Sequence, residues 1–236
     1  MNIADPEMDP VASPGAIGAT RPAAGSVAGR SRRGRKPNAE LTDPRPARQR
    51  LLDAANELFY SEGVQSVGID RIIEHAGVAK GSLYNAYGSK EALVTAYLAA
   101  RHEGTTSRLQ RAIESVDDPR EKILAVFDAQ AAIFREPGFH GCAFVAAGAE
   151  AEPGSQIEEA TAHYRSWIRS MFTRLARAAG ARHPRQLGEQ LQLLYDGGGI
   201  AANMDHKPAI AKASRAAAAA LVDAALAPAA GRRDAR

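Results

Sequence analysis

The sequence has a single cysteine, Cys142, among its 236 residues. One cysteine cannot form a disulfide within the chain, which excludes a disulfide-stapled secreted domain and fits a reducing cytoplasm. No apolar run approaches the roughly 18 residues of a membrane helix, and the first residues lack the apolar core of a secretion signal. We therefore expect a cytoplasmic protein that makes no contact with a membrane.

Aromatic residues are scarce, at 6%, and sustained runs that alternate Val, Ile or Thr with polar residues are lacking. Ala, Leu, Arg, Glu and Gln dominate the middle and the end of the chain, and these residues favour helices. Apolar residues make up 45% of the chain, which is enough for a core. The net charge of +3 bears on solubility and nonspecific binding rather than on the fold. The composition predicts an all-α protein of about nine helices.

Catalytic motifs are also lacking. We find no phosphate-binding loop, no dinucleotide glycine motif, no paired-histidine zinc motif and no nucleophile elbow. The six histidines are scattered along the chain. The sequence therefore predicts no enzyme activity, no cofactor and no metal site, although an active site assembled only in space stays open as an alternative.

Composition divides the chain into four parts. Residues 1–43 are rich in Pro, Ala, Gly and Ser and have almost no large apolar residues, so we expect a disordered tail. Two helical domains are expected at 44–104 and 105–228, and a second disordered tail at 229–236. Inside the first tail, residues 30–36 hold five basic residues.

Apolar periodicity and end signals place the helices. The first runs from about residue 45 to Gly63, and a fourth begins after Ser89, a predicted N-cap. Two short helices at 69–76 and 80–87 lie between them. Five more are expected: one that begins at Pro119, then 142–150, 155–179, 185–203 and 208–226, with Ser155 as the cap of the third of these.

The segment 68–87 has the pattern of a helix-turn-helix. Two short helices must cross over a tight turn, and Gly77 tolerates the left-handed backbone that the bend requires. Ile72, Val78 and Leu83 have the spacing that locks the two helices together. The second helix is about 12 Å long, which fits across the roughly 12 Å major groove of DNA.

The outward face of the second helix has the chemistry of a DNA contact. Lys80 and Tyr84 suit phosphates, Asn85 has the amide geometry for adenine, and Lys90 lies by a helix N-terminus that favours a phosphate. For Leu83 and Tyr87, packing is the main expected role. The candidate DNA-binding residues are Arg33, Arg35, Arg48, Gly68, Lys80, Gly81, Ser82, Leu83, Tyr84, Asn85, Tyr87 and Lys90.

This segment resembles the TetR family of transcription regulators. The resemblance covers about residues 48–98 and includes AGV-x-KG-x-LY at 76–84, Tyr87, and SKEAL at 89–93. It implies an all-α homodimer with a small N-terminal DNA-binding domain and a larger C-terminal domain that binds an effector and dimerises. The chain departs from the family pattern at two helix caps, Gly68 and Ala79. An Ala cap costs about 1 kcal/mol relative to Ser, so these changes bear on operator affinity.

The basic motif at residues 33–37 permits two interpretations. It resembles the core of an arm that places arginine in a narrow minor groove. Alternatively, it is a solvated basic tail that adds only nonspecific, salt-sensitive affinity. Both interpretations stay open at this point.

The C-terminal part offers candidates for an effector pocket and a dimer interface. Cys142 beside His140 is a candidate reactive thiol or half of a metal site, and the alternative is a buried, inert cysteine. The last two helices are expected to dimerise through a stripe of Leu187, Leu191 and Leu194, with the glycines at 197–199 and the alanines at 216–220. The candidate pocket residues are Phe127, Phe134, Phe144, Tyr164, Trp167, Met171 and Tyr195, with His163 and Asn203 as orienting groups.

Together these patterns predict a ligand-responsive transcription regulator. As a dimer it would bind a palindromic double-stranded DNA operator as a repressor, in association with the nucleoid, and a small-molecule effector would release it. Two-fold symmetry would place the recognition helices roughly 34–36 Å apart or further. A nonspecific, nucleoid-type DNA binder is the alternative within DNA-binding proteins.

Overall fold

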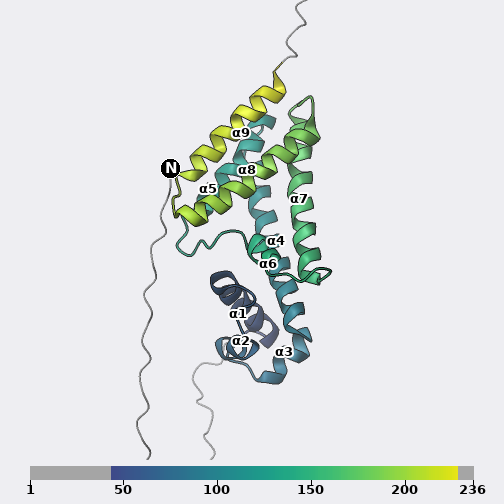
Figure 1. The fold of residues 1–236 in the computed structure, drawn as a ribbon, viewed down its shortest axis with the longest axis vertical. Coiled ribbons are helices and arrows are strands. Elements are labelled where there is room, and N and C mark those ends of the chain that lie inside the picture. Colours follow the sequence, from purple (N-terminus) through teal and green to yellow (C-terminus); the bar gives the residue numbers. More distant parts are fainter. Residues whose placement is uncertain (1–43, 228–236) are drawn as a thin grey trace, which may run out of the picture. The chain divides into compact units, whose positions relative to one another are not determined.

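A computed structural model describes residues 44–227. The two expected tails, and with them Arg33, Arg35 and the basic motif, lie outside the described residues. The described part of the chain consists of nine α-helices and contains no strand (Figure 1), which confirms the all-α prediction. The helices are α1 (Ala47–Glu62), α2 (Ile69–Ala76), α3 (Lys80–Tyr87), α4 (Lys90–Glu114), α5 (Pro119–Ile133), α6 (Ala143–Ala149), α7 (Gln156–Ala178), α8 (Pro184–Asp205) and α9 (Ile210–Leu226).

The predicted helix ends are confirmed where the sequence has a clear signal. The Ser89 hydroxyl accepts a hydrogen bond from the Ala92 N–H at the start of α4, and the Ser155 hydroxyl accepts one from the Glu158 N–H at the start of α7. Such caps satisfy N–H groups that have no partner within the helix. At the C-terminal end of α1, Gly63 has a φ of 88°, which glycine adopts readily.

Helices α1, α2 and α3 form a three-helix unit at the N-terminal end of the described chain. Gly77 connects α2 to α3 with φ 60° and ψ 38°, the left-handed conformation that the sequence predicts. Leu51 on α1, Ile72 on α2 and Leu83 on α3 are each 0% exposed. One residue from each helix thus meets in a common core, which fixes the angle between α2 and α3.

Helix α4 joins this unit to the rest of the protein without a break (Figure 1). It packs on α1 and, further along, on α5 and α7. Its 25 residues correspond to about 37 Å at 1.5 Å per residue. The expected domain boundary at residue 104 falls inside this helix, so a structural division would have to cross a continuous helix.

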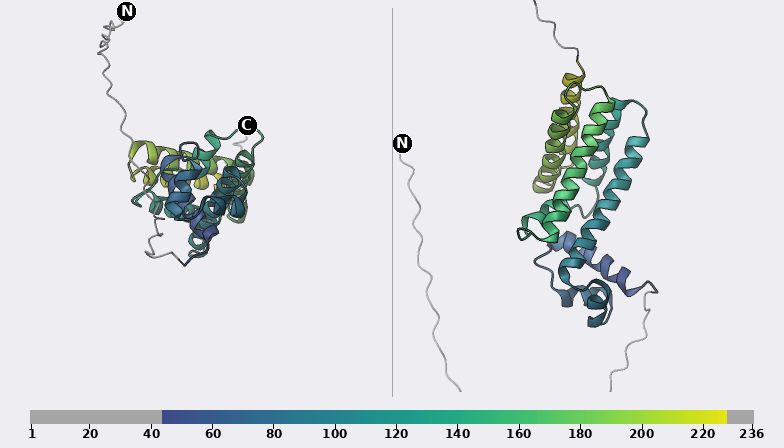
Figure 2. Two further views of the ribbon diagram at one scale, coloured as in Figure 1. Left: turned by 90° about the horizontal axis from the view of Figure 1, so that it is seen from below. Right: turned by 90° about the vertical axis from the view of Figure 1, so that its right-hand side faces the viewer.

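The C-terminal helices pack around an aromatic core. Helix α8 lies between α7 and α9, and α5 contacts both α7 and α9 (Figure 2). The ring centroids of Phe127 and Phe172 lie 5.7 Å apart, and both rings contact Tyr195. Aromatic pairs at such distances stabilise a core beyond their buried area.

The prediction that Leu187, Leu191 and Leu194 form a dimer interface is wrong for two of these three residues. Leu187 is 2% and Leu191 is 0% exposed within the single chain, because this face of α8 packs inside the bundle. Leu194 is half-buried. The glycines have a similar explanation: a Cβ at Gly198 would lie 2.6 Å from the Ser214 hydroxyl oxygen on α9. At Gly198, the missing side chain therefore allows α8 to lie close to α9 of the same chain.

None of the helices in residues 44–227 combines the length and the hydropathy that crossing a bilayer would require.

Candidate functional site

The exposed face of α3 is the first candidate site. Lys80, Gly81, Tyr84 and Asn85 are exposed, and Tyr84, a large aromatic residue, keeps 47% of its surface accessible. Ser82 on the same helix is partly exposed. Polar groups and an aromatic hydroxyl thus gather on one side of a short helix, as a helix that reads a DNA groove requires.

The opposite side of α3 belongs to the core. Leu83 is 0% exposed, so its side chain is not available to DNA, and its place among the DNA-contacting candidates is corrected to a packing residue. The reason is the helical period: Leu83 points away from the face that Tyr84 and Lys80 share.

Lys80 is held by a carboxylate that the sequence analysis overlooked. Its ammonium donates a hydrogen bond of 2.8 Å to the Asp70 carboxylate, across the turn of the helix-turn-helix. This hydrogen bond, and then the charge of Asp70, raises the pKa of Lys80. Both side chains are largely exposed. In the absence of DNA, the cation expected on a phosphate therefore has a partner within the protein.

Arg48 and Tyr87 hold α1 against α3. The Arg48 guanidinium donates to the Ala86 carbonyl and lies 4.3 Å above the centre of the Tyr87 ring. The Tyr87 hydroxyl donates to the Arg48 carbonyl at 2.8 Å. Burial raises the pKa of Tyr87. These groups are engaged within the protein, so the structure gives both residues a positioning role for α3.

Gly68 and Lys90 lie at helix N-termini. Gly68 precedes α2 with an extended backbone and provides no side-chain cap, and Ala79 likewise leaves α3 without one. Lys90 is the first residue of α4, after the cap at Ser89. Partial burial lowers the pKa of Lys90, and the charge of Glu150 opposes that effect.

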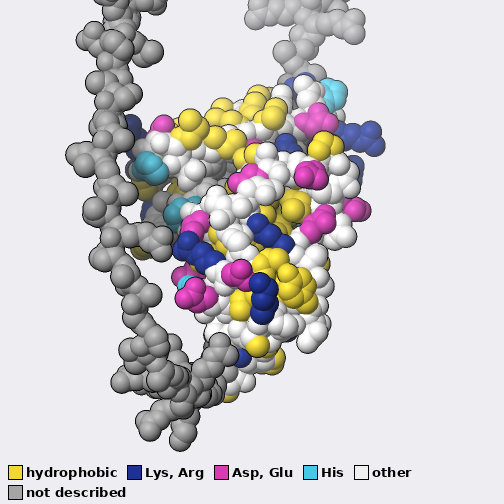
Figure 3. Space-filling view, turned by 60° about the horizontal axis from the view of Figure 1, so that its bottom comes forward, with side chains coloured by type: hydrophobic (Ala, Val, Ile, Leu, Met, Phe, Trp, Pro, Cys, Tyr) yellow, Lys and Arg dark blue, Asp and Glu magenta, His cyan; other side chains and the backbone are white. Residues whose placement is uncertain are grey.

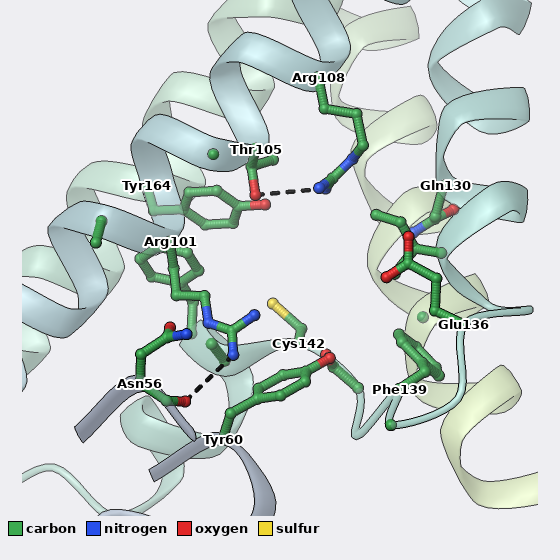
Figure 4. Close-up of a pocket in the computed structure, with 18 of the residues that line it drawn as sticks. Asn56, Tyr60, Arg101, Thr105, Arg108, Gln130, Glu136, Phe139, Cys142 and Tyr164 are labelled. Carbon is green, nitrogen blue, oxygen red and sulfur yellow. Dashed lines mark hydrogen bonds between the residues drawn. The ribbon is translucent and has the colours of Figure 1, made fainter. Parts of the chain in front are cut away.

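A cavity of about 410 Å³ lies between α1, α4, α5, α7 and α8 and the segment that precedes α6 (Figure 4). Its volume is within the range of ligand pockets. Four of the seven candidate pocket residues line it: Phe134, Phe144, Tyr164 and Tyr195.

The other three candidates lie elsewhere. Phe127 is 1% exposed and packs in the aromatic core, so it does not reach the cavity. Trp167 and Met171 line a separate groove of about 210 Å³ formed by α4 and α7. Of the two expected orienting groups, His163 lies in another groove beside His102, and Asn203 packs against Gly141. Helical spacing alone did not distinguish aromatic residues that pack in the core from aromatic residues that line the cavity.

Three charged residues of the cavity were not among the candidates predicted from the sequence. Arg101, Arg108 and Glu136 all line it (Figure 4). The Arg101 guanidinium lies 3.7 Å above the centre of the Tyr60 ring and donates to the Asn56 carbonyl at 3.4 Å. Arg108 donates to the Thr105 hydroxyl at 3.5 Å. A spacing of seven residues puts Arg101 and Arg108 on one face of α4, and this was the available signal.

Other polar groups of the cavity are paired. Asp196 accepts a hydrogen bond of 2.8 Å from Arg165, and burial raises the pKa of Asp196 while Arg165 opposes the rise. The Gln130 amide donates to the Tyr195 carbonyl at 2.7 Å. These residues therefore form part of the wall and are already committed to the protein.

Cys142 lines the same cavity. Burial raises the pKa of its thiol, whereas a reactive cysteine has a lowered pKa. The neighbouring His140 packs edge-on against Tyr60, with ring centroids 5.6 Å apart. Among residues 44–227, no three His, Cys, Asp or Glu side chains are grouped as a metal site would require. The raised pKa of the thiol favours the inert cysteine over the sensing one.

Several contacts connect the cavity wall to the N-terminal three-helix unit. The Tyr60 hydroxyl on α1 donates to the Gly141 carbonyl at 2.9 Å. The Glu150 carboxylate, after α6, accepts a hydrogen bond of 2.8 Å from the Gln65 N–H, between α1 and α2. A change in the shape of the cavity can therefore be transmitted to α1 and to the segment between α1 and α2, and both helices pack against α3.

Comparison with known proteins identifies this arrangement. Residues 51–97 match the family model described as bacterial regulatory proteins, tetR family. The whole fold is similar to the crystal structure of a TetR-family transcriptional regulator from Streptomyces coelicolor, with a TM-score of 0.73 and 30% identity. The match covers 77% of this chain and 96% of that one. The chain belongs to the TetR family of transcriptional regulators.

Curated relatives match over part of the chain. The regulator TtgR of Pseudomonas putida is 37% identical over 108 residues, which are 41% of this chain and 51% of TtgR. The regulator UidR of Escherichia coli is 33% identical over 75 residues, 32% of this chain and 38% of UidR. The activator FasR of Mycolicibacterium smegmatis is 34% identical over 87 residues, 36% of this chain and 40% of FasR. The chain thus spans about half or less of the length of these relatives.

Proposed function

We propose that this TetR-family protein is a homodimeric repressor that binds a palindromic DNA operator through α2 and α3 and is released by a small-molecule effector. The observation that carries the proposal is the exposed polar face of α3, with Tyr84 and Asn85 pointing outward from a buried Leu83. Its eight residues correspond to about 12 Å of helix, which matches the width of the major groove.

Base and phosphate contacts divide between residues of this face. Asn85 has the geometry to read adenine, and Ser82 either a base edge or a phosphate. Tyr84, Lys80 and Lys90 would contact phosphates, and Gly81 and Gly68 allow the backbone to come close. Arg48 and Tyr87 would set the angle of α3 without direct reading. The arginines Arg33 and Arg35 would add contacts from the basic motif.

An apolar face on α8 supports a dimer. Leu193, Ile200 and Met204 are exposed at 68%, 42% and 73%, and Gly197 lies between them with open space where a Cβ would be. The positions 193, 197, 200 and 204 share one face of α8. The hydrophobic side chains along the upper edge of Figure 3 lie on the side of the molecule where α8 and α9 run. A partner helix would remove this surface from water.

The cavity supports the effector step. It is enclosed by helices of both expected domains, 44–104 and 105–228, so a ligand there would contact α1 as well as the C-terminal bundle. A ligand changes operator affinity only if it binds the DNA-bound and free conformations differently. Release of a repressor is the proposed direction, and activation, which the name of FasR records for that relative, is the outcome that the experiment distinguishes.

Footprinting of the purified protein on DNA upstream of its own gene and neighbouring genes tests the proposal. We expect a discrete protected site with two-fold symmetry. Asn85→Ala should weaken protection at least about fivefold, because a bidentate base contact is worth about 1–3 kcal/mol. Gln110→Ala, on the exposed surface of α4 away from α3, is the matched control. Uniform coating of DNA without a symmetric site would favour the nonspecific, nucleoid-type binder.

A further inference from the structure

The cavity contains two cationic side chains without an anionic partner. Arg101 and Arg108 line it from one face of α4. Because seven residues separate them, their backbone positions lie about 10.5 Å apart along the helix axis. Within residues 44–227, neither guanidinium forms an ion pair with a carboxylate, and the Nε atoms of both are buried without a hydrogen-bond partner. A guanidinium has five N–H donors, and the protein engages one side-chain nitrogen of each arginine, at 3.4 and 3.5 Å.

The acidic groups of the cavity do not neutralise this pair. Asp196 is bound to Arg165, and Asp53 is bound to Arg45. Glu136 lies across the cavity from Arg101 (Figure 4) and is exposed to solvent at the rim. With Glu136 charged, the cavity retains one excess positive charge. Burying an unpaired charge is costly, and an anion that pairs with it recovers part of this cost.

Six aromatic residues contribute to the remaining wall. Tyr60, Phe139, Phe144 and Tyr164 line the cavity together with Phe134 and Tyr195. Flat rings and aliphatic groups pack well against such a wall. A planar guanidinium, in turn, matches a carboxylate with two parallel hydrogen bonds. The combination selects a molecule with one anionic end and a flat apolar body.

Arg101 also holds α1, the first helix of the DNA-binding unit. Its guanidinium stacks on Tyr60 and donates to the carbonyl of Asn56, and both residues belong to α1. A carboxylate bound by both Arg101 and Arg108 would draw the Arg101 guanidinium toward Arg108 and so away from Tyr60 and Asn56. Occupation of the cavity therefore acts directly on the position of α1.

Resting on the proposed function, we propose that the effector is a small organic acid whose carboxylate binds Arg101 and Arg108, and that it acts by drawing Arg101 away from Tyr60 and Asn56. No bond is made or broken in this step. The ligand class is an aromatic or otherwise flat apolar monocarboxylate.

Titration calorimetry on the full chain, without DNA, tests the ligand class. The probes are cinnamate, 2-naphthoate and indole-3-acetate, each beside its neutral primary amide. We expect at least one acid to bind at least about tenfold more tightly than its amide, since a charged hydrogen bond contributes about 1.5–3 kcal/mol. Arg101→Gln and Arg108→Gln should each remove this preference, and Arg111→Gln, an exposed arginine further along α4, should keep it.

Three results would overturn the inference: no acid binds, the amides bind equally well, or the acid preference survives in both variants. Circular dichroism confirms that each variant is folded.

A second arm repeats the titration with operator DNA bound, where we expect the acid to bind more weakly, since coupling between two ligands is reciprocal. Equal affinity with and without DNA would contradict the Arg101 step. The first arm uses no operator DNA, so its result can still be interpreted if the DNA-binding proposal fails.

Discussion

Gly188 on α8 lies so close to Thr173 on α7 that a Cβ at position 188 would be 2.4 Å from the threonine hydroxyl oxygen and 2.9 Å from its backbone nitrogen. A contact with backbone cannot be relieved by a side-chain rotation. The absence of a side chain at residue 188 therefore sets the distance between α7 and α8, the two long helices of the C-terminal bundle.

Gly188→Ala should destabilise the protein although alanine favours helices. Overpacking costs about 1–3 kcal/mol, against a gain of about 1 kcal/mol in helix propensity, so we expect a net loss of about 1 kcal/mol. Gly104→Ala is the matched control, because a Cβ at this position in α4 meets nothing within 4 Å; it should gain about 1 kcal/mol. Urea unfolding measures both, and a stabilised Gly188→Ala variant would contradict the packing argument.

Asp70→Asn should tighten operator binding. The change removes the carboxylate that holds Lys80 at 2.8 Å, so the ammonium no longer has to leave an ion pair to reach a phosphate, and a negative charge near DNA is lost. We expect a several-fold gain in affinity at low salt, measured by fluorescence anisotropy. Asp117→Asn, exposed beyond the C-terminal end of α4, is the control. Unchanged affinity for Asp70→Asn would show that the pair does not restrain Lys80.

Acid should destabilise the protein through His102. Its imidazole is surrounded by Trp167, Tyr164, Phe144 and His163 at ring distances of 4.8 to 6.3 Å. Burial, and then the charge of His163, lowers the pKa of His102 below 6.5, and Glu103 opposes the shift. A lowered pKa means that the unfolded chain binds the proton more tightly, so the free energy of unfolding falls as the pH drops through 6.5.

The matched variant for this prediction is His102→Gln. Because glutamine does not titrate, the fall in stability below the ordinary histidine pKa should become smaller, as thermal unfolding at a series of pH values would show. His75→Gln, at an exposed histidine on α2 that pairs with Glu57, is the comparison. An identical pH profile for His102→Gln and the unmodified protein would assign the acid effect to other groups.

Ile200→Glu should dissociate the proposed dimer. The residue is exposed in the single chain, on the same face as Leu193 and Met204, and a carboxylate there would be buried without a partner in a dimer. Analytical ultracentrifugation should show monomers at concentrations at which the unmodified protein is dimeric. Glu114→Lys, an exposed charge change on α4, should leave the oligomeric state as it is. A dimeric Ile200→Glu variant would place the interface elsewhere.

The helices were largely predictable because their signals are local. Ser89, Ser155 and Gly77 act on the backbone within a few residues, so sequence alone located the ends of α4 and α7 and the turn of the helix-turn-helix. The cavity was not predictable in this way. Phe127 and Phe144 are both buried aromatic residues on predicted helices, yet only Phe144 also lines the cavity. That difference arises from the crossing of helices far apart in the chain.

Charged residues illustrate the same limit. Asp70 and Lys80 meet only because α2 and α3 cross at a fixed angle, and Arg101 meets Asn56 and Tyr60 only because α4 packs on α1. Single-residue chemistry made Lys80 a candidate phosphate contact, which stays a prediction, and did not indicate its partner Asp70. For Arg101, no local motif distinguished it from a solvated arginine.

The continuity of α4 has a consequence for genetic screens. The same uninterrupted helix begins beside α3 and carries Arg101 and Arg108 into the cavity. Under the proposed function, alleles that map to α4 should therefore disturb the effector response and operator binding together. Under the proposed function, alleles that alter inducer choice alone should map instead to the cavity walls contributed by α5 and α7, neither of which is continuous with α3.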